Sequence, residues 1–516
     1  MSWIVIGEEN GLIKLVSKSG EDGLLPKGAY LTIEKESTKF ILRVDKSLQS
    51  EPFAPSPMII DMDLSGLIQD QKCQNVIHAF RVRDISNRTD GKIDFIPPQS
   101  IARRSNQEEI NEAMGTSDKE GPIVFVATVH AGHNQLLVDD EENFITTHLP
   151  NDIFYHQMLI CGKTGSGKTV ATKYLAQYFV EELEGAVLAI NVKDVDFLRM
   201  NKHSNTINPK TLKEWQILDK KPHGIENYVV YYPANTDVNA YRDVDIEYFK
   251  PVTLSVHKIE PEALTGLLQG ISDVGAQNLP DIFRYWQSRM KNNENSFHDF
   301  LQYFIDVGEN DDRNFQTLNI RGDISSIPLH PATYNNVQRT LVSATNYFDN
   351  EDAVLINESD ILEKGKMSII NVGNKGLQFG SIMLRHLLHR IVETKSVGES
   401  NVPILIVIDE VHNFYNSNAS QDALGDLDTI CRQGRSQEIG VIFSSQNPND
   451  IPRGLESVIN SKIFFRSDAT LSKIPAVKIS SDELESLKKG FAIGTIHDLP
   501  QLKILKFPLA YAGVFE

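Results

Sequence analysis

The run Gly162-Lys163-Thr164-Gly165-Ser166-Gly167-Lys168-Thr169 consists of a glycine, four intervening residues and the triplet Gly-Lys-Thr. Apolar residues 158–161 (MLIC) precede the run, and residues 170–180 (VATKYLAQYFV) follow it with helical spacing. In this order of strand, loop and helix, the glycines let backbone N–H groups turn toward a polyphosphate, and the helix N-terminus adds partial positive charge. The stretch therefore predicts a nucleoside triphosphate site within an α/β fold.

Side chains of this loop are expected to make separate contacts with the nucleotide. Lys168 should reach the β- and γ-phosphates of ATP, and the Thr169 hydroxyl should bind Mg²⁺. A glycine-rich turn with an unrelated lysine is the alternative, and the flanking strand and helix argue against it. The predicted nucleotide-binding residues are Gly162, Lys163, Thr164, Gly165, Ser166, Gly167, Lys168, Thr169 and Val170.

The bulk composition narrows the class of the protein. A chain of 516 residues, 41% hydrophobic and 23% charged, has room for a nucleotide-binding core and further domains. No apolar run approaches the roughly 20 residues of a membrane span, and the opening residues MSWIVIGEENG lack a signal pattern. Cys73, Cys161 and Cys431 lie far apart without metal-binding spacing, so a reducing, cytoplasmic location is expected. The formal net charge of −18 argues against a broadly basic surface for nucleic acid, but not against a local basic channel inside an oligomer.

The first 145 residues have the pattern of a small β-barrel. Short apolar strands alternate with polar turns, and Glu9-Asn10-Gly11 has the composition of a hairpin turn. Residues 105–118, which are polar and acidic, are expected to form a helix or a connector. The predicted strands are Trp3–Ile6, Leu12–Val16, Tyr30–Ile33, Phe40–Val44, Met58–Met62, Val76–Val82, Lys92–Ile96 and Ile123–Val129.

Alternating strands and helices follow the phosphate-binding loop. Their continuous apolar strands predict a parallel or mixed sheet, covered on both faces, whose carboxyl ends line the nucleotide site. Between them, residues 259–348 have helical spacing, and their aromatic side chains are expected to pack as a core rather than to stack on bases. The predicted strands are Ala186–Val192, Tyr228–Tyr232, Val252–Val256, Met367–Val372, Ile404–Ile408, Val441–Ser445, Ile463–Phe465 and Phe491–Ile493.

These patterns predict a division of the chain into a barrel, a core, an insertion and an extension. The barrel is expected at residues 1–145, and the core in two parts at residues 146–258 and 349–500. The helical insertion is expected at residues 259–348, and a C-terminal extension with strand character at residues 501–516.

A second nucleotide motif follows on the predicted strand Ile404–Ile408. The strand ends in Asp409 and Glu410, an arrangement in which the first acid holds the Mg²⁺ shell and the second orients and deprotonates the attacking water. A strand that simply ends at a polar turn is the alternative, and the upstream phosphate-binding loop argues against it. His412 is expected within reach of this site, with packing and chemical roles both open.

Polar residues around the next strand extend the candidate site. Residues 426–435 (DLDTICRQGR) predict a helix that carries Arg432 and Arg435 on one face. An arginine supplied by a neighbouring subunit would stabilise charge in the transition state, and a solvated or DNA-facing pair is the alternative. Gln446 follows the strand Val441–Ser445, where it is placed to sense the γ-phosphate or the attacking water.

Three stretches together resemble the HerA branch of the FtsK–HerA superfamily of hexameric DNA-pumping ATPases: GKTGSGKT, the strand ending IDEVH, and CRQGRSQEIGVIFSSQNP. The resemblance covers residues 150–500, and residues 1–145 are similar in strand pattern to the HAS-barrel of HerA proteins. It implies a RecA-like P-loop NTPase core with an N-terminal β-barrel and a helical insertion.

The resemblance also implies roles for particular residues. Lys168 and Thr169 are the Walker A pair, and Asp409 and Glu410 are the Walker B pair, with Thr169 and Asp409 on the metal. Gln446 is the sensor, and Arg432 or Arg435 is the arginine finger that acts on a neighbouring subunit. The implied catalytic set is Lys168, Glu410, Arg432, Arg435 and Gln446.

The implied function is a homohexameric, ATP-driven translocase of double-stranded DNA. Its implied partner is an effector, either a nuclease or a sirtuin-like enzyme, in DNA processing or antiphage defence. Two alternatives stay open: a ring that chiefly serves as an assembly scaffold licensing an effector enzyme, and an ATPase of conjugation or type IV secretion. Candidate pore residues are Lys193, Arg199, Lys202 and the loop Gly373–Gln378, with ordinary surface positions as the alternative.

This chain departs from the HerA pattern at two positions. His156 stands where HerA proteins often carry an arginine, which leaves the set of arginine fingers open. Asp409 stands where some relatives have glutamate as the first Walker B acid.

Overall fold

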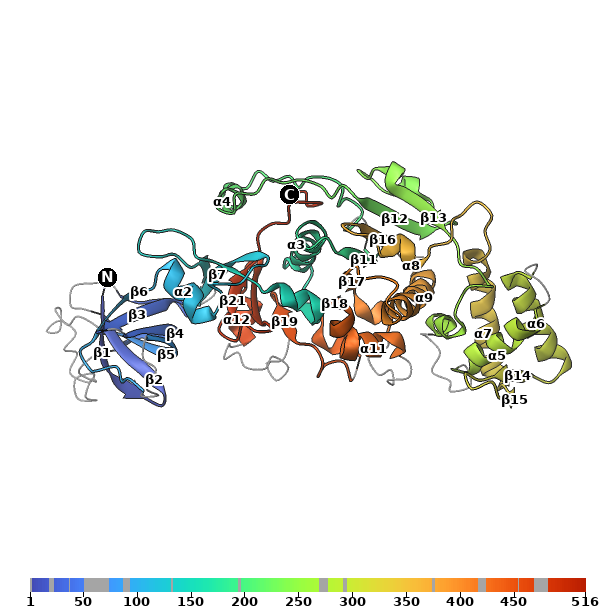
Figure 1. Ribbon diagram of the computed structural model, residues 1–516, viewed down its shortest axis with the longest axis horizontal. Helices are drawn as coiled ribbons and strands as arrows, with labels where there is room; N and C mark the ends of the chain where they lie inside the picture. Colours follow the sequence, from blue (N-terminus) through green and yellow to red (C-terminus); the bar gives the residue numbers. More distant parts are fainter. Residues whose placement is uncertain are drawn as a thin grey trace, which may run out of the picture. The chain divides into compact units, whose positions relative to one another are not determined.

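The computed structural model (Figure 1) describes residues 2–516 except 18–22, 37, 51–73, 87–92, 131–132, 194–195, 269–276, 291–294, 374–375, 416–423, 453 and 468–480. Its residues group into two compact units. The first unit contains Met1–Asn151 and Ile463–Phe507, and the second contains Asp152–Lys462 and Pro508–Glu516. Among the described helices, none combines the length and the apolar character needed to cross a bilayer.

The N-terminal residues form a closed antiparallel β-barrel with the strand order β1-β2-β5-β4-β3-β6. The predicted small barrel is therefore confirmed. Asn10 (φ 53°) and Gly11 (φ 74°) both have positive φ, which suits the two-residue hairpin turn between the first two strands. The barrel strands are β1 (Trp3–Glu9), β2 (Leu12–Ser17), β3 (Tyr30–Lys35), β4 (Thr38–Ser50), β5 (Gln74–Ser86) and β6 (Ile101–Arg104).

Some strand predictions in this unit were wrong or cannot be compared. The described residues 93–96 of the predicted strand Lys92–Ile96 form no strand, and Ile93 and Phe95 are 73% and 75% exposed, so their apolar side chains face no core. The sequence analysis missed β6, and the predicted strand Met58–Met62 lies outside the described residues.

Outside the barrel, the strands of this unit have the order β20-β21-β7-β8 with antiparallel pairing, and β9 also pairs with β7. Because β21 hydrogen-bonds to β7, residues 463–507 pack with the N-terminal residues, whereas the sequence analysis placed residues 349–500 in the core. The elements are β7 (Ile123–His130), β8 (His133–Leu136), β9 (Thr146–His148), α12 (Ser481–Glu485), β20 (Phe491–Thr495) and β21 (Ile504–Lys506).

The second unit is built on a sheet of order β13-β12-β16-β11-β17-β18-β10 in which every neighbouring pair is parallel. Every residue of β10, β11, β16, β17 and β18 is buried, as expected for a sheet covered on both faces. The predicted RecA-like α/β core is therefore confirmed.

The strands of this core are β10 (Gln157–Cys161), β11 (Ala186–Asn191), β12 (Tyr228–Pro233), β13 (Phe249–Val252), β16 (Met367–Asn371), β17 (Ile404–Asp409) and β18 (Ile439–Ser445), and β19 (Ser461–Phe464) follows them in the chain. Its helices are α3 (Lys168–Glu181), α4 (Pro209–Ile217), α8 (Glu358–Ile361), α9 (Leu377–Ser396) and α11 (Asp426–Gln433). The predicted strand Val252–Val256 is wrong beyond Val252, where β13 ends.

Residues 259–348 form the predicted helical insertion together with an unpredicted hairpin, β14–β15. Phe283 and Phe300 are fully buried with ring centroids 4.8 Å apart, and the rings of Phe304 and Phe315 are 4.5 Å apart. These contacts confirm that the aromatic residues pack as a core. The elements are η5 (Pro261–Leu268), α5 (Leu279–Arg289), α6 (Phe297–Asn310), β14 (Asn314–Leu318), β15 (Ile324–Pro328), α7 (Pro331–Ala344) and η7 (Thr345–Tyr347).

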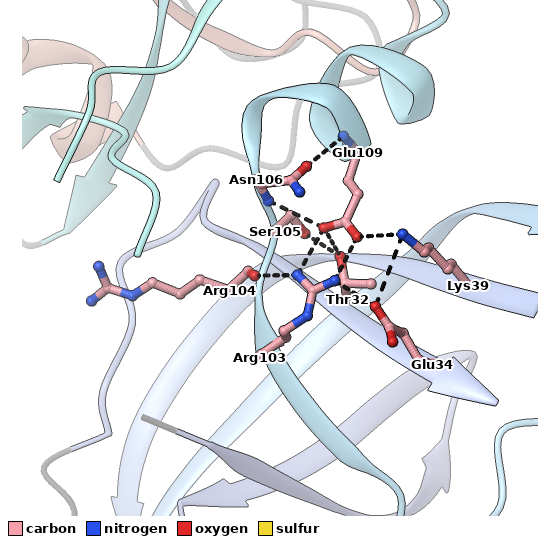
Figure 2. Close-up of polar contacts among 8 residues, drawn as sticks. All are labelled: Thr32, Glu34, Lys39, Arg103, Arg104, Ser105, Asn106 and Glu109. Atoms are coloured by element: carbon pink, nitrogen blue, oxygen red, sulfur yellow. Dashed lines mark hydrogen bonds and ion pairs between the residues drawn. The ribbon is translucent and has the colours of Figure 1, made fainter. Parts of the chain in front are cut away.

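A buried carboxylate fastens helix α2 (Gln107–Met114) to the barrel (Figure 2). Glu109 is 3% exposed and accepts hydrogen bonds from Thr32 Oγ1 at 2.9 Å and Lys39 Nζ at 3.1 Å. The Arg103 guanidinium donates to both carboxylate oxygens, at 2.9 and 2.6 Å, and the Asn106 backbone N–H donates at 3.1 Å. Burial alone would raise the pKa of Glu109, but these donors, Arg103 foremost, outweigh it and lower the pKa to about 2.

We expect Glu109→Gln to destabilise the barrel by about 2 kcal/mol, because Arg103 and Lys39 would keep their charges beside a neutral amide. Folding lowers the pKa of Glu109 from 4.5 to about 2, so the wild-type advantage is complete at neutral pH and disappears as the pH falls through this interval. Amide hydrogen exchange of β3 and β4, measured between pH 7 and pH 3 or so, reports this difference for the barrel alone.

Glu112→Gln is the matched control, because Glu112 is 39% exposed in its ion pair with Arg83. This substitution should cost less than about 0.5 kcal/mol. Equal loss of exchange protection in both variants would show that the buried carboxylate contributes no more than a surface pair.

Candidate nucleotide-binding site

The phosphate-binding loop joins the end of β10 to the N-terminus of α3, as predicted. Gly165 (φ 74°) and Gly167 (φ 114°) adopt left-handed backbone conformations, which cost a glycine little and a larger residue considerably more. Gly167 is the N-cap of α3, a helix of 14 residues, and Lys168 and Thr169 open that helix. The loop therefore presents backbone N–H groups and the positive end of a helix dipole at one point.

Lys168 is 5% exposed in this setting. Burial lowers the pKa of Lys168, and the nearby Glu410 carboxylate opposes that shift. The ammonium group is thus partly stripped of water and stands among acidic groups. It is suited to bind an incoming phosphate, because the negative charge of the phosphate stabilises the ammonium in place of the lost water.

The two predicted acids stand at the end of β17, with Asp409 as its last residue and Glu410 directly after it, and β18 alone separates this strand from β10. Asp409 pairs in register with Ser444 of β18 and is 4% exposed, and burial raises the pKa of Asp409 to about 6. Glu410 is 2% exposed and stands in the left-handed region (φ 49°, ψ 60°). A non-glycine residue in that conformation costs on the order of 1 kcal/mol or more, and such strain concentrates at functional sites.

A row of polar contacts crosses the carboxyl edge of the sheet through Glu410. Thr164 Oγ1 donates to Gln446 Oε1 at 3.5 Å, and Gln446 Nε2 donates to Glu410 Oε1 at 3.0 Å. Lys193 forms an ion pair with the same Glu410 oxygen. These residues follow β10, β18, β17 and β11, which are consecutive strands of the sheet, so the row links each strand end to the next.

These contacts decide the protonation of Glu410. Burial alone would raise the pKa of Glu410, but the Lys193 ammonium and the Gln446 amide outweigh it, so the pKa is lowered. His412 Nδ1 lies 3.7 Å from Glu410 Oε2 and 3.5 Å from Asp450 Oδ2, which places His412 beside the acid, as anticipated.

The donor set fits a nucleotide with Mg²⁺. Thr169 and Asp409 offer a hydroxyl and a carboxylate, which are the hard oxygen ligands that Mg²⁺ prefers. Ser166 Oγ and Glu410 Oε2 are buried and accept or donate no hydrogen bond within the described part of the chain. Buried polar atoms of this kind normally have partners, and a bound phosphate and its water would supply them.

The two predicted arginines lie apart from this row. Arg432 Nε donates to both carboxylate oxygens of Asp428 at 2.9 Å, and Arg435 Nη2 donates to Asp152 Oδ2 at 3.0 Å. Arg435 precedes β18 and Asp152 precedes β10, and these strands are parallel, so this pair lies at the amino edge of the sheet. The phosphate-binding loop leaves the opposite edge, on the order of 15 Å away.

The candidate pore residues separate in the structure. Lys193 joins the acidic site, while Arg199 and Lys202 pair with Asp243 at 3.6 Å and Asp245 at 3.0 Å. In the loop Gly373–Gln378, residues 374–375 lie outside the described residues.

Sequence analysis missed the partner of Glu410. The sequence held only part of the signal: Lys193 closely follows a predicted strand, but the pairing of β11 with the strand that ends in Asp409 is seen only in the structure. It also missed the buried amide pair at the ends of β11 and β16, in which Asn191 Nδ2 donates to Asn371 Oδ1 at 3.0 Å. Neither pairing follows from spacing, because strand order was unknown.

The fold and the site together define an ATPase of the P-loop class. The family model described as "Helicase HerA, central domain" matches residues 136–377, and the one described as "Helicase HerA-like C-terminal" matches residues 330–470. The chain belongs to the HerA family of ATP-binding, ATP-hydrolysing enzymes.

Individual relatives were also found. The DNA double-strand break repair helicase HerA of Sulfurisphaera tokodaii is 20% identical over 511 residues, which cover 94% of this chain and 90% of that protein. The protein of the same name from Sulfolobus acidocaldarius is 27% identical over 181 residues, 31% of this chain and 37% of its own length.

The comparison with solved structures also found two similar proteins. VirB4 of Thermoanaerobacter pseudethanolicus has 11% identity and a TM-score of 0.45, covering 76% of this chain and 97% of that one. The plasmid coupling protein TrwB in complex with ADP and Mg²⁺ has 13% identity and a TM-score of 0.44, covering 79% of this chain and 92% of that one.

We expect Lys168→Met to remove ATP binding without lowering the melting temperature of the nucleotide-free protein. Burial disfavours the charged ammonium, and the pKa of Lys168 is therefore lowered on folding. Removing this charge should not destabilise the nucleotide-free protein. Thermal unfolding with and without ATP and Mg²⁺ measures both effects. A variant that melts well below wild type, or that is still stabilised by ATP, would contradict the assignment of Lys168.

Proposed function

We propose that this ATPase moves double-stranded DNA and works as a homohexameric ring. The ATPase part of the proposal rests on the row of hydrogen bonds from Thr164 through Gln446 to Glu410, together with Lys168, which lies close enough to Glu410 for their charges to affect each other's pKa. Support for the DNA half comes from the family, whose relatives are named DNA double-strand break repair helicases.

In this proposal the residues of one chain divide the chemistry between them. Lys168 binds the β- and γ-phosphates, and Thr169 and Asp409 hold Mg²⁺, which supplies positive charge to those phosphates when bound. Glu410 orients a water molecule and accepts its proton as the water oxygen attacks the γ-phosphorus, while ADP departs with the bridging oxygen. Gln446, bonded to both Thr164 and Glu410, positions the water against the γ-phosphate.

The position of the arginines favours a site shared between subunits. Arg435 stands at the opposite edge of the sheet from its own phosphate-binding loop, so it is unsuited to that site. In a head-to-tail ring two different surfaces of neighbouring subunits meet, so an arginine remote from its own site can act on the site of a neighbour. The N-terminal barrel would join subunits or dock an effector, a nuclease or sirtuin-like enzyme, in DNA processing or antiphage defence.

The proposed activity predicts that linear duplex DNA raises ATP turnover of a hexamer-sized particle. Glu410→Gln should lower kcat at least about 100-fold while ATP still binds, because the amide cannot accept the proton. Turnover assays with light scattering in the same buffer measure both. Unchanged turnover in Glu410→Gln would overturn the assigned chemistry, and a hexamer that hydrolyses ATP only with an added effector would favour the scaffold alternative.

Mixed rings test the arginine in trans. Glu410→Gln subunits keep Arg435 but lack the base, and Arg435→Ala subunits keep the base but lack the finger, so each alone should be nearly inactive. An equal mixture should regain roughly a quarter of wild-type turnover, because about one boundary in four joins a complete site to an intact arginine.

Mixing Glu410→Gln with Lys168→Met is the matched control and should regain nothing, since both defects lie in a subunit's own site. If the mixture of Glu410→Gln with Arg435→Ala shows no more ATP turnover than this control, Arg435 is not the arginine finger. The same experiment with Arg432→Ala then decides between the two arginines.

A further inference from the structure

Charge is distributed unevenly over the helical insertion. Residues 324–348, which include β15 and α7, contain no aspartate or glutamate and a single lysine or arginine, Arg339. With 69 acidic residues among 516, a stretch of this length would average about three. Residues 297–312, which form α6 and the two positions after it, carry five exposed acidic residues and no lysine or arginine. The surface of α6 therefore repels an anionic polymer, and the surface of α7 does not.

The exposed side of α7 is polar along its whole length. The helix packs against the insertion through Tyr334, Val337 and Leu341, and the Tyr334 ring stacks on the Phe304 ring of α6 with centroids 5.3 Å apart. Exposed residues recur three or four positions apart between these contacts and continue into η7, so they lie along one side of the helix. We call this set the α7 face, and it consists of Asn335, Asn336, Arg339, Val342, Ser343 and Asn346.

Arg339 is available for an anion from outside the chain. Its guanidinium has no hydrogen bond or ion pair within the part of the chain that the structure describes. A phosphate that binds this cation therefore has no carboxylate to displace. The neighbouring Asn336 and Ser343 lie one helical turn away on either side and offer further hydrogen-bond donors.

The composition of the α7 face fits a nucleic acid better than a protein. Arginine, asparagine and serine side chains donate hydrogen bonds to phosphate and sugar oxygens, and such contacts hold a nucleic acid without reading its sequence. The core of a protein interface is rich in apolar and aromatic side chains, whereas Val342, at 51% exposure, is the apolar member of this face. The absence of acidic residues supplies the charge complementarity that a phosphate backbone requires.

The α7 face is connected to the carboxyl edge of the core sheet. Ser343 Oγ hydrogen-bonds to Gln378 Oε1 at 3.2 Å. Gln378 lies in the first turn of α9, which begins shortly after the end of β16, and β16 runs parallel to the strands of the nucleotide site. The face is thus continuous with the loop Gly373–Gln378, which the sequence analysis named as a candidate pore loop.

We propose that the α7 face binds the phosphate backbone of duplex DNA, with Arg339 as its cation and Asn336 and Ser343 as hydrogen-bond donors. This inference rests on the proposed function and deepens it by naming where the insertion meets DNA. Because the contacts are with phosphates, binding at this face depends on salt concentration and not on base sequence.

The test measures the affinity of the full chain for a fluorescently labelled linear duplex by anisotropy at several salt concentrations. Arg339→Gln and Asn336→Asp should each weaken binding at least about threefold, and equally for duplexes of unrelated sequence. Arg339→Gln should also make the salt dependence shallower, because fewer counterions are released when DNA binds. Asn310→Asp is the matched control, because Asn310 is exposed at the end of α6 and the substitution adds the same charge. It should bind DNA as wild type does.

Melting temperature and particle mass, measured alongside, should match wild type in both α7 variants, because both side chains are exposed. If both variants bind DNA as tightly as wild type, the inference is overturned. It is also overturned if binding is lost only because hexamers dissociate, since the face would then join copies of the chain. A wild-type protein that binds no duplex would show that the proposed function has failed. A wild-type protein that binds DNA beside two unaffected variants would show that only the role of the α7 face has failed.

Discussion

Parallel pairing of β11, β17, β18 and β10 is the constraint on which the site depends. These strands are wholly buried, so their polar neighbours can stand only where the strands end. In-register parallel strands end at one edge, and that edge therefore collects Thr164, Gln446, Glu410 and Lys193 from parts of the chain far apart in sequence. Because an antiparallel strand in the row would carry its following residue to the far edge, a single reversed strand would break the chain of contacts.

The site is arranged at a cost to the stability of the nucleotide-free protein. Burial raises the pKa of Asp409 and lowers the pKa of Lys168, so folding disfavours the charged form of both groups. Strain at Glu410 adds to this cost, and so does the buried Ser166 hydroxyl, which has no hydrogen-bond partner among the described residues. A bound nucleotide with its cation would offset the costs at Lys168, Asp409 and Ser166 together. It would bring phosphate to the lysine, metal to the aspartate and hydrogen-bond acceptors to the hydroxyl.

Sequence reasoning located the elements whose structure depends on neighbours in the chain. The loop from Gly162 to Thr169 and the two acids at the end of β17 are local patterns with local causes, and the barrel followed from alternating strands and an Asn-Gly turn. It failed where pairing between distant segments decides. The pairing of β21 with β7, which draws residues 463–507 toward the N-terminal unit, and the contact of Lys193 with Glu410 both require a strand order that spacing does not contain.

The two buried glutamates differ in ways that separate a structural acid from the acid proposed for chemistry. Glu109 and Glu410 are 3% and 2% exposed, and cationic partners lower the pKa of each. Glu109 lies in a helix of ordinary geometry, and both of its carboxylate oxygens accept hydrogen bonds that stabilise the negative charge. Neither oxygen is left open to take a proton from a substrate. Glu410 leaves Oε2 without a hydrogen bond among the described residues, stands in a strained conformation, and meets a lysine that solvent can reach. Since burial and pKa direction are the same in both, unsatisfied bonding capacity together with strain is the ground on which we propose Glu410, and not Glu109, as the acid that takes part in chemistry.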